Sequence, residues 1–270
     1  MKPGGAPPRT PLGLPDRPRV LLLGGLDPSG GAGLTADARV LSWHDVDDLP
    51  VALSLTVQSR LGFEALDRIP TRQWRRALEA VLEEGPVRAV KIGLLADSRQ
   101  VEDVAAALGG IEAPIVVDPI LASTAGGLRH GRDMALALRR RLLPIASLAT
   151  PNRPEFDALC GGEARLLLEE GCRAVLVKGG HGSEPSVVDV YHGSEGTRAF
   201  EHARSDVGDV HGTGCAYASA AAAALALGAE LPAACERASE FLSLCLCGMG
   251  PPPSDGLPRR LRLPSAASRR

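Results

Sequence analysis

Hydrophobic positions along the chain fall into two alternating patterns. Short runs rich in Val, Leu and Ile, bounded by Gly, Pro or polar residues, predict strands over residues 19–24, 51–57, 88–93, 114–118, 147–150, 174–178 and, as an edge strand, 186–191. Between most of these runs, apolar residues at helical spacing predict helices over 34–43, 72–84, 98–108, 133–143 and 164–170. This alternation predicts an α/β fold with a mainly parallel central sheet and helices on both of its faces.

The length of the chain and its two ends set the expected domain organisation. A chain of 270 residues, 44% of them hydrophobic, can bury a large core. Residues 1–18 and 250–270 are rich in Pro, Arg and Ser, so we expect a disordered N-terminal tail and a flexible C-terminal tail. The folded domain is then expected to span residues 19–249.

Charge and composition narrow the classes of partner. The net charge is −2 and only 3% of the residues are aromatic, which argues against a nucleic-acid-binding module or an anionic membrane as the partner. No apolar run is long enough to span a bilayer, and the N-terminus has no hydrophobic signal-peptide core, so we expect a cytoplasmic protein. The six cysteines lack the spacing of a metal site, and in a reducing compartment most are expected to be small buried residues.

Lysine and asparagine are rare in this chain. Only Lys2, Lys91 and Lys178 are lysines among 30 basic residues, and Asn152 is the single asparagine. Lys91, Lys178 and Asn152 all fall at the ends of predicted strands. Chance could account for so few residues, but in an arginine-biased sequence these positions are the first to inspect for function.

The segments that follow the predicted strands hold the most unusual sequence of the chain. They are GLDPSGGAG (25–33), QSR (58–60), GLLAD (93–97), DPI (118–120), TPNRPE (150–155), KGGH (178–181) and HGTGC (211–215). In open parallel sheets ligands bind beyond the carboxyl ends of the strands. We therefore expect these segments to line one small-molecule site.

The glycine-rich segment 25–33 matches neither of the common nucleotide motifs. It lacks the GxGxxG spacing of dinucleotide-binding folds, and the chain has no GxxxxGK[ST] phosphate loop. Gly30, Gly31 and Gly33 precede a helix that carries Asp37. The glycines could serve tight turns with positive φ, or they could let a flat ligand lie close to the backbone.

The segment HGTGC combines a helix start with a thiol. Gly212, Thr213 and Gly214 leave backbone N–H groups free at a helix start, which predicts an anion site suited to a phosphate. Cys215 stands in the first helical turn, where the thiolate is favoured, and it could take the proton from an attacking hydroxyl. The alternative is a small buried residue in an alanine helix. We favour function for Cys215 and the buried role for the other five cysteines.

Two further segments supply oxygen ligands and a positive charge. Asn152 and Glu155 are suited to a Mg²⁺ ion held largely through water and phosphates, or they could cap the helix that follows. Lys178 ends a strand before two glycines, where it could meet a nucleotide phosphate or simply be solvated.

Taken in order, these segments resemble a known family. GLDPSGGAGLTADAR, VQS, KIGLL, VVDPI, TPNRPE, VLVKGGH and HGTGC are similar to the hydroxymethylpyrimidine/phosphomethylpyrimidine kinases of thiamine biosynthesis, which belong to the ribokinase-like superfamily. The resemblance spans residues 19–248. It implies a ribokinase-like, three-layer α/β/α fold and a homodimer.

The resemblance also implies a reaction and assigns residues to it. Such enzymes transfer the γ-phosphoryl group of ATP to 4-amino-5-hydroxymethyl-2-methylpyrimidine and then to its monophosphate. By the resemblance, the residues at the pyrimidine are Gly25, Ala32, Asp37, Gln58, Leu94 and Ile120. Those facing Mg²⁺ and ATP are Asn152, Glu155 and Lys178, and Gly212, Thr213 and Gly214 form the anion hole beside the base Cys215.

Some segments depart from the family pattern. Gln58-Ser59-Arg60 stands where the family usually carries QNT, and residues 121–131, LASTAGGLRHG, replace a lysine-containing lid. Two alternatives therefore stay open. One is a pyridoxal kinase-like enzyme of the same superfamily, and the other is a catalytically silent regulator that binds a pyrimidine or a nucleotide.

Overall fold

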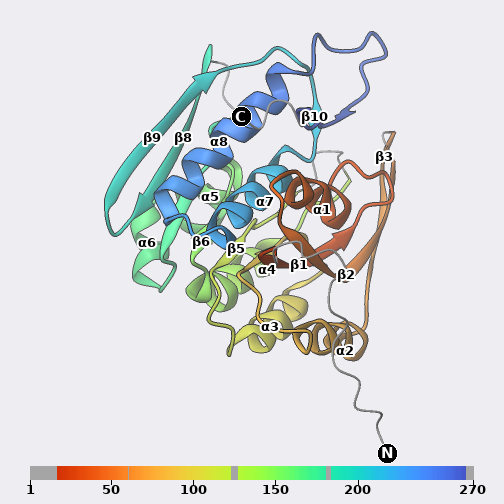
Figure 1. Cartoon of the computed structure of the whole chain (residues 1–270), viewed down its shortest axis with the longest axis vertical. Helices are drawn as coiled ribbons and strands as arrows, with labels where there is room; N and C mark the ends of the chain where they lie inside the picture. Colours follow the sequence, from red (N-terminus) through yellow and green to blue (C-terminus); the bar gives the residue numbers. More distant parts are fainter. Residues whose placement is uncertain (1–16, 60, 123–126, 181–183, 266–270) are drawn as a thin grey trace, which may run out of the picture.

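A single nine-stranded sheet forms the centre of the protein. The computed structural model describes residues 17–265 except 60, 123–126 and 181–183. The strand order is β3-β2-β1-β4-β5-β6-β7-β8-β9 (Figure 1). The six parallel strands are β1 (Arg19–Leu26), β2 (Asp47–Ser59), β4 (Ala89–Ile92), β5 (Ile115–Val117), β6 (Leu148–Ala149) and β7 (Ala174–Val177). The prediction of a mainly parallel sheet is confirmed.

Antiparallel strands extend the sheet on both sides. β3 (Gly62–Arg68) pairs with β2, while β8 (Ser186–Gly193) and β9 (Gly196–Ala203) form a hairpin beyond β7. The prediction that residues 186–191 form an edge strand is wrong, because β9 lies outside them. β9 reads GTRAFEHA and is largely exposed, so it has no hydrophobic run that could reveal it.

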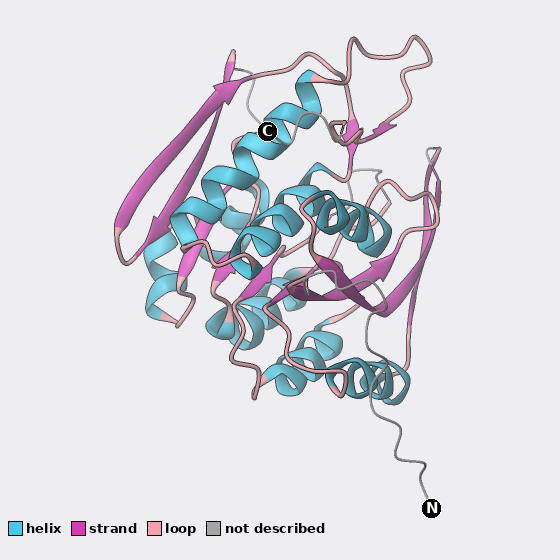
Figure 2. Ribbon diagram, in the orientation of Figure 1, coloured by secondary structure: helices cyan, strands magenta, loops and turns pink. Residues whose placement is uncertain are grey.

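Helices cover both faces of the sheet, as predicted (Figure 2). One face packs against α1 (Gly33–Trp43), α7 (Thr213–Ala226) and α8 (Leu231–Cys247). The other packs against α2 (Thr71–Leu82), α3 (Ser98–Leu108), α4 (Arg132–Ala137), α5 (Arg153–Cys160) and α6 (Ala164–Glu169). The strand β1 serves both layers, since Val20 and Leu22 join the first cluster whereas Leu21 and Leu23 join the second.

Helix α7 runs through the first of these two layers. Every residue from Cys215 to Ala226 is buried. A helix that is apolar all round belongs inside a core, and small alanine side chains let its backbone approach the sheet, α1 and α8. Its amino end is thereby fixed close to the carboxyl ends of the strands.

The helix predicted over 133–143 changes its winding along its length. After α4 the chain makes a π-helical turn, Leu138–Leu142, and then a short 3-10 turn, Leu143–Ile145. Pro144 lies in this last turn, where it has no N–H to continue an α-helix. The helix predicted over 98–108 agrees with α3.

The segment after α8 returns to the domain. Strand β11 (Arg259–Arg260) pairs with β10 (Val210–His211), and Leu261 is buried. The Arg259 guanidinium donates hydrogen bonds to the carbonyl oxygens of Met249, Val207 and Gly250. Residues 259–261 of the predicted C-terminal tail are therefore anchored to the domain, whereas residues 1–16 of the N-terminal tail lie outside the described part. Within that part, no helix has both the length and the apolar character to cross a membrane.

Candidate active site

The carboxyl ends of the parallel strands bring several of the predicted segments together. The strand order changes direction between β1 and β4, and open α/β sheets bind ligands at such a switch point. Asp118 follows β5 and Lys178 follows β7. A Cβ atom at Gly214 would lie 3.3 Å from Nζ of Lys178 and 3.4 Å from a carboxylate oxygen of Asp118. The predicted anion-binding turn and the strand-end lysine are therefore neighbours.

The glycine-rich segment is folded around the carboxylate of Asp27, which follows β1. Asp27 accepts hydrogen bonds from the backbone N–H of Ser29 (2.7 Å) and Ala32 (2.8 Å) and from the Ser29 hydroxyl (2.8 Å). Its Oδ2 also lies 3.2 Å from Nε2 of His211. Burial raises the pKa of Asp27, but the hydrogen bonds from His211, Ser29 and Ala32 outweigh it and hold the pKa below its ordinary value. Sequence reasoning missed Asp27 as a site residue, although an aspartate directly after a buried strand was a usable signal.

The glycines of this segment make room for protein atoms. Gly30 and Gly33 have φ of 68° and 58°, so the tight-turn interpretation is confirmed for both. A Cβ at Gly33 would overlap the carbonyl oxygen of Gly25, and a Cβ at Gly31 would overlap the ring of His211. At Gly31 and Gly33 the space that a side chain would need is thus filled by protein atoms, while the alternative interpretation, that a flat ligand lies against these glycines, stays a prediction.

The turn before α7 has the conformation that an anion site requires. Gly212 is the N-cap with φ 88°, and no acidic side chain occupies the first turn that begins at Thr213. The free backbone N–H groups and the helix dipole favour a bound anion there. Gly214 is the next residue, and without a side chain it leaves these groups open to Lys178 and Asp118.

Cys215 is in the predicted place but not in the predicted ionisation state. Its side chain is buried, and burial raises the pKa of the thiol to about 11, with Lys91 acting in the opposite direction. The expectation of a lowered pKa is wrong, because desolvation outweighs the helix start. Cys160, Cys172, Cys235 and Cys245 are buried as expected, whereas Cys247 is exposed.

Lys178 is held by Asp118, the residue that follows β5. Its Nζ donates to Oδ1 of Asp118 at 2.8 Å, and the Thr150 hydroxyl lies 3.4 Å from the same oxygen. Burial lowers the pKa of Lys178, but Asp118 and Glu155 outweigh it and keep the pKa above its ordinary value. Sequence reasoning placed DPI in the site but did not select Asp118, the residue that fixes the lysine.

Asn152 and Glu155 form a capping box at the start of α5. The Asn152 side chain accepts from the Glu155 backbone N–H at 2.9 Å, and Glu155 accepts from the Asn152 backbone N–H at 2.8 Å. The capping interpretation is confirmed. Burial, partly offset by Lys178, raises the pKa of Glu155 to about 7. In the described part of the chain, no group of three His, Cys, Asp or Glu residues could hold a metal ion.

Asp37 lies inside the protein and does not line the site. Its Oδ2 accepts from Lys91 Nζ at 2.6 Å, its Oδ1 accepts from the Ser219 hydroxyl at 2.8 Å, and its side chain is 1% exposed. The expectation that Asp37 faces the pyrimidine does not hold, because both oxygens already have partners under α7. Helical spacing alone did not show which way this carboxylate points.

The remaining residues expected at the pyrimidine are spread around the same edge. Gly25 adjoins Leu94, since a Cβ at Gly25 would lie 3.3 Å from the Leu94 side chain. Ala32 is the N-cap of α1, and Ile120 is half-buried two residues after Asp118. Gln58 is half-buried on β2, where it pairs with Phe63 of β3. Arg60 and His181 lie outside the described residues.

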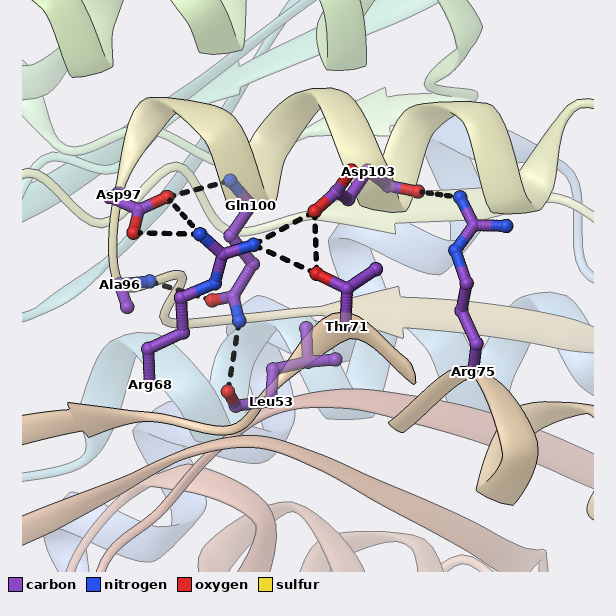
Figure 3. Close-up of polar contacts among 8 residues, drawn as sticks. All are labelled: Leu53, Arg68, Thr71, Arg75, Ala96, Asp97, Gln100 and Asp103. Carbon is purple, nitrogen blue, oxygen red and sulfur yellow. Dashed lines mark hydrogen bonds and ion pairs between the residues drawn. The ribbon is translucent and has the colours of Figure 1, made fainter. Parts of the chain in front are cut away.

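A polar network joins the segment after β4 to strands β2 and β3 (Figure 3). The buried amide of Gln100 accepts from the Ala96 backbone N–H at 2.8 Å and donates to the Leu53 carbonyl at 2.9 Å. Arg68 of β3 donates to Asp97 and to Asp103 of α3. The network ties the segment after β4 to β2, beside the register shift at Gly24 and Gly25.

Comparison with known proteins decides the family. A family model described as phosphomethylpyrimidine kinase matches residues 27–250. The chain belongs to this family. Two relatives named hydroxymethylpyrimidine/phosphomethylpyrimidine kinase support this: one from Streptomyces coelicolor, 35% identical over 88% of this chain and 89% of its own, and one from Mycobacterium tuberculosis strain H37Rv, 36% identical over 85% and 88%.

Solved structures confirm the ribokinase-like fold expected for this family. A pyridoxal kinase from Staphylococcus aureus in complex with ADP superposes with a TM-score of 0.82, at 23% identity, over 95% of this chain and 96% of the other. The phosphomethylpyrimidine kinase from Clostridium difficile superposes with a TM-score of 0.72, at 27% identity, over 86% of this chain and 98% of the other.

Proposed function

We propose that this protein transfers the γ-phosphoryl group of ATP to the hydroxymethyl group of 4-amino-5-hydroxymethyl-2-methylpyrimidine, and then phosphorylates the resulting monophosphate, as its relatives' names indicate. One observation carries the proposal: the turn from Gly212 to Gly214 opens α7 directly beside Lys178. The backbone N–H groups of a helix start and the ammonium group of a lysine both bind phosphate, so together they suit a phosphoryl group that is transferred from one oxygen atom to another.

Phosphoryl transfer requires positioning and neutralisation of charge. The backbone N–H groups of the turn hold the transferred phosphoryl group, and Lys178 adds a positive charge that Asp118 keeps in place. The substrate alcohol lies on the side of Gly25, Leu94 and Gln58.

The chain's oxygen donors fit a Mg²⁺ ion bound largely through water and phosphate. Asp118 and Glu155 share one neighbour of opposite charge, Lys178, and the pKa of Glu155 is raised mainly by burial, with a further contribution from the charge of Asp118. A divalent cation would neutralise the surplus negative charge and the phosphate charge. The Asn152 and Glu155 side chains each accept one hydrogen bond of the capping box and keep further lone pairs, so we assign both, together with Asp118, to the surroundings of the cation.

Cys215 is the group we assign to the proton of the alcohol. The O–H proton moves to the Cys215 thiolate, the alcohol oxygen bonds to phosphorus, and the bond from phosphorus to the ADP oxygen breaks. With a pKa near 11 the resting thiol is protonated at neutral pH, so it must release its proton before it accepts another. Stabilisation of the thiolate is therefore part of catalysis.

A pyridoxal kinase activity is the second candidate. A pyridoxal kinase from Bacillus subtilis in complex with ADP superposes with a TM-score of 0.80, at 25% identity, over 91% of this chain and 98% of the other. Pyridoxal also carries a hydroxymethyl group on an aromatic ring. The same phosphate-binding turn would serve both alcohols, so the pyrimidine side of the site decides between them. The expected homodimer stays a prediction.

The test is a product analysis with purified protein, ATP and Mg²⁺. Hydroxymethylpyrimidine, its monophosphate and pyridoxal are supplied separately, and products are resolved by mass spectrometry. We expect pyrimidine mono- and diphosphate, their loss in Lys178→Met, and their retention in Arg173→Met, which removes an exposed charge from the surface before β7. Exclusive formation of pyridoxal phosphate would favour the second candidate.

A further inference from the structure

Lys91 is a fully buried cation that the proposed mechanism leaves without a role. It lies on β4, and its side chain has no exposed surface. Its Nζ donates to Asp37, which also accepts from Ser219, so three elements of the core converge on one charge. Burying an ion pair costs desolvation energy, and apolar residues of similar volume often stabilise a protein as well or better. A contribution to stability alone does not explain the pair.

The pair contacts α7 one helical turn after the candidate base. Cys215 precedes Ser219 by four residues on α7, so both side chains project from the same face of the helix, one turn apart. Ser219 contacts Asp37, so the face that carries Cys215 is turned toward the pair. A Cβ at Gly93 would lie 2.8 Å from Nζ of Lys91, which shows that the lysine extends along β4 toward the site edge.

We propose that Lys91 is the positioning residue for Cys215: its ammonium group, fixed by Asp37 and Ser219, stabilises the Cys215 thiolate from below. The proposal rests on the proposed function in that it assigns the substrate proton to Cys215. A lysine anchored in this way cannot swing toward the phosphate. Its positive charge therefore acts on the thiol, while Lys178 acts on the nucleotide side.

Charged groups of both signs face the thiol. Lys91 from β4 and Lys178 after β7 favour the thiolate, whereas Asp37 from α1 and Asp118 after β5 oppose it. The backbone N–H of Gly33, at the start of α1, also favours it. Lys91 is the foremost of the groups that counteract burial. Without it, the thiol should ionise at a higher pH.

The variants separate charge from folding. Lys91→Met alone leaves Asp37 buried and unpaired, which threatens folding, so the main variant is Lys91→Met/Asp37→Leu, which removes both charges. Lys91→Arg retains the positive charge. Ser219→Ala removes only the hydroxyl group that donates to Asp37. Ser239→Ala is its matched control, because Ser239 is also a buried serine bonded to a buried aspartate, Asp189, but on α8.

The experiment measures how fast iodoacetamide alkylates Cys215 between pH 8 and 9.5, by mass spectrometry of the peptide that contains it. Over this range the rate follows the thiolate fraction. We expect a fall of about threefold in the double variant, corresponding to about half a pKa unit, because the loss of the opposing charge of Asp37 partly offsets the loss of Lys91. We expect a smaller fall in Ser219→Ala, and near-normal rates in Lys91→Arg and Ser239→Ala. Wild-type alkylation rates in both the double variant and Ser219→Ala would overturn the proposal.

The readout does not depend on turnover. Alkylation is measured without substrate, so failure of the wild-type protein to phosphorylate the pyrimidine would overturn the proposed function and leave the alkylation result intact. Ser219→Ala retains both charges and serves as the decisive variant should the double variant not fold. In active protein, a positioning role also requires the pH dependence of kcat to shift in the same direction as alkylation.

Discussion

Gly31 and Gly212 contact each other through their backbones. A Cβ at Gly212 would overlap the carbonyl oxygen of Gly31, and Gly212 also has a φ of 88°. The two glycine-rich segments, one after β1 and one before α7, are thus packed against each other. Although they are far apart in sequence, the two segments therefore form one structural unit.

Gly212→Ala should therefore disable the enzyme. The added Cβ must push the two segments apart, which displaces the N–H groups of the turn, and we expect kcat/KM to fall at least about 100-fold. Gly228→Ala is the matched control: Gly228 has a φ of 91°, but a Cβ there meets nothing within 4 Å. The control should lose only about 1 kcal/mol of stability from backbone strain and keep its activity. Equal activity of the two variants would contradict the account.

Asp27→Asn should lower stability in a pH-dependent way. The folded-state pKa of Asp27 is lowered, so its contribution is fully present above the ordinary carboxylate pKa and is lost as the pH falls through the folded value. We expect the free energy of unfolding to fall by about 1–3 kcal/mol at pH 7, and we expect this difference to become smaller below about pH 4. Urea unfolding at both pH values measures it, with exposed Asp67→Asn as the control. A loss that does not change with pH would show that the charge of Asp27 is irrelevant.

The effect of Glu155→Gln on stability should depend on pH in the opposite direction. The folded-state pKa is raised to about 7, so ionisation of Glu155 destabilises the folded protein as the pH rises from about 4.5 to above 7. Glutamine keeps an oxygen that can accept from Asn152 but carries no charge. In the absence of nucleotide and Mg²⁺, we expect the free energy of unfolding of the variant, relative to that of wild type, to rise by up to about 2 kcal/mol from pH 5 to pH 8. Parallel stability curves for the two proteins over this range would refute the prediction.

Arg259→Ala should loosen the C-terminal segment. Arg259 donates to three backbone carbonyls, which lose their partner in the variant, and we expect a cost of about 2 kcal/mol. Because β11 pairs with the strand that carries His211, the KM for the pyrimidine should also rise several-fold. Thermal unfolding and steady-state kinetics check both effects. Exposed Arg262→Ala should change neither, and a similar loss in both variants would argue against a specific anchor.

The sequence revealed the parts of the fold that are buried on both sides. Strands such as β1 and β7 are continuous hydrophobic runs, because both of their faces are covered by helices. β3 and β9 escaped prediction because they are partly exposed and rich in polar residues. The C-terminal segment escaped because its order comes from Arg259 and from pairing with β10, a contact between segments far apart in sequence.

The position of the candidate site could be predicted from the sequence better than the charge partners and pKa values of its residues. Segments after strands must meet at one edge, so topology together with the rarity of lysine and the Gly-Thr-Gly motif selected Lys178 and Cys215. The direction of Asp37 depends on Lys91, 54 residues away, and nothing in helical spacing reports such a partner. The pKa of Cys215 was misjudged because the helix start was considered without the burial that the surrounding alanines already indicated.

The most direct test of the central claim compares Cys215→Ala with the wild-type protein. Transfer of phosphate from ATP to hydroxymethylpyrimidine is followed by mass spectrometry, and binding of ATP and of the pyrimidine is measured by calorimetry. We predict that the variant binds both ligands nearly as tightly as wild type but loses most of its turnover. Near-normal turnover by Cys215→Ala would contradict the account and remove the thiol from the mechanism.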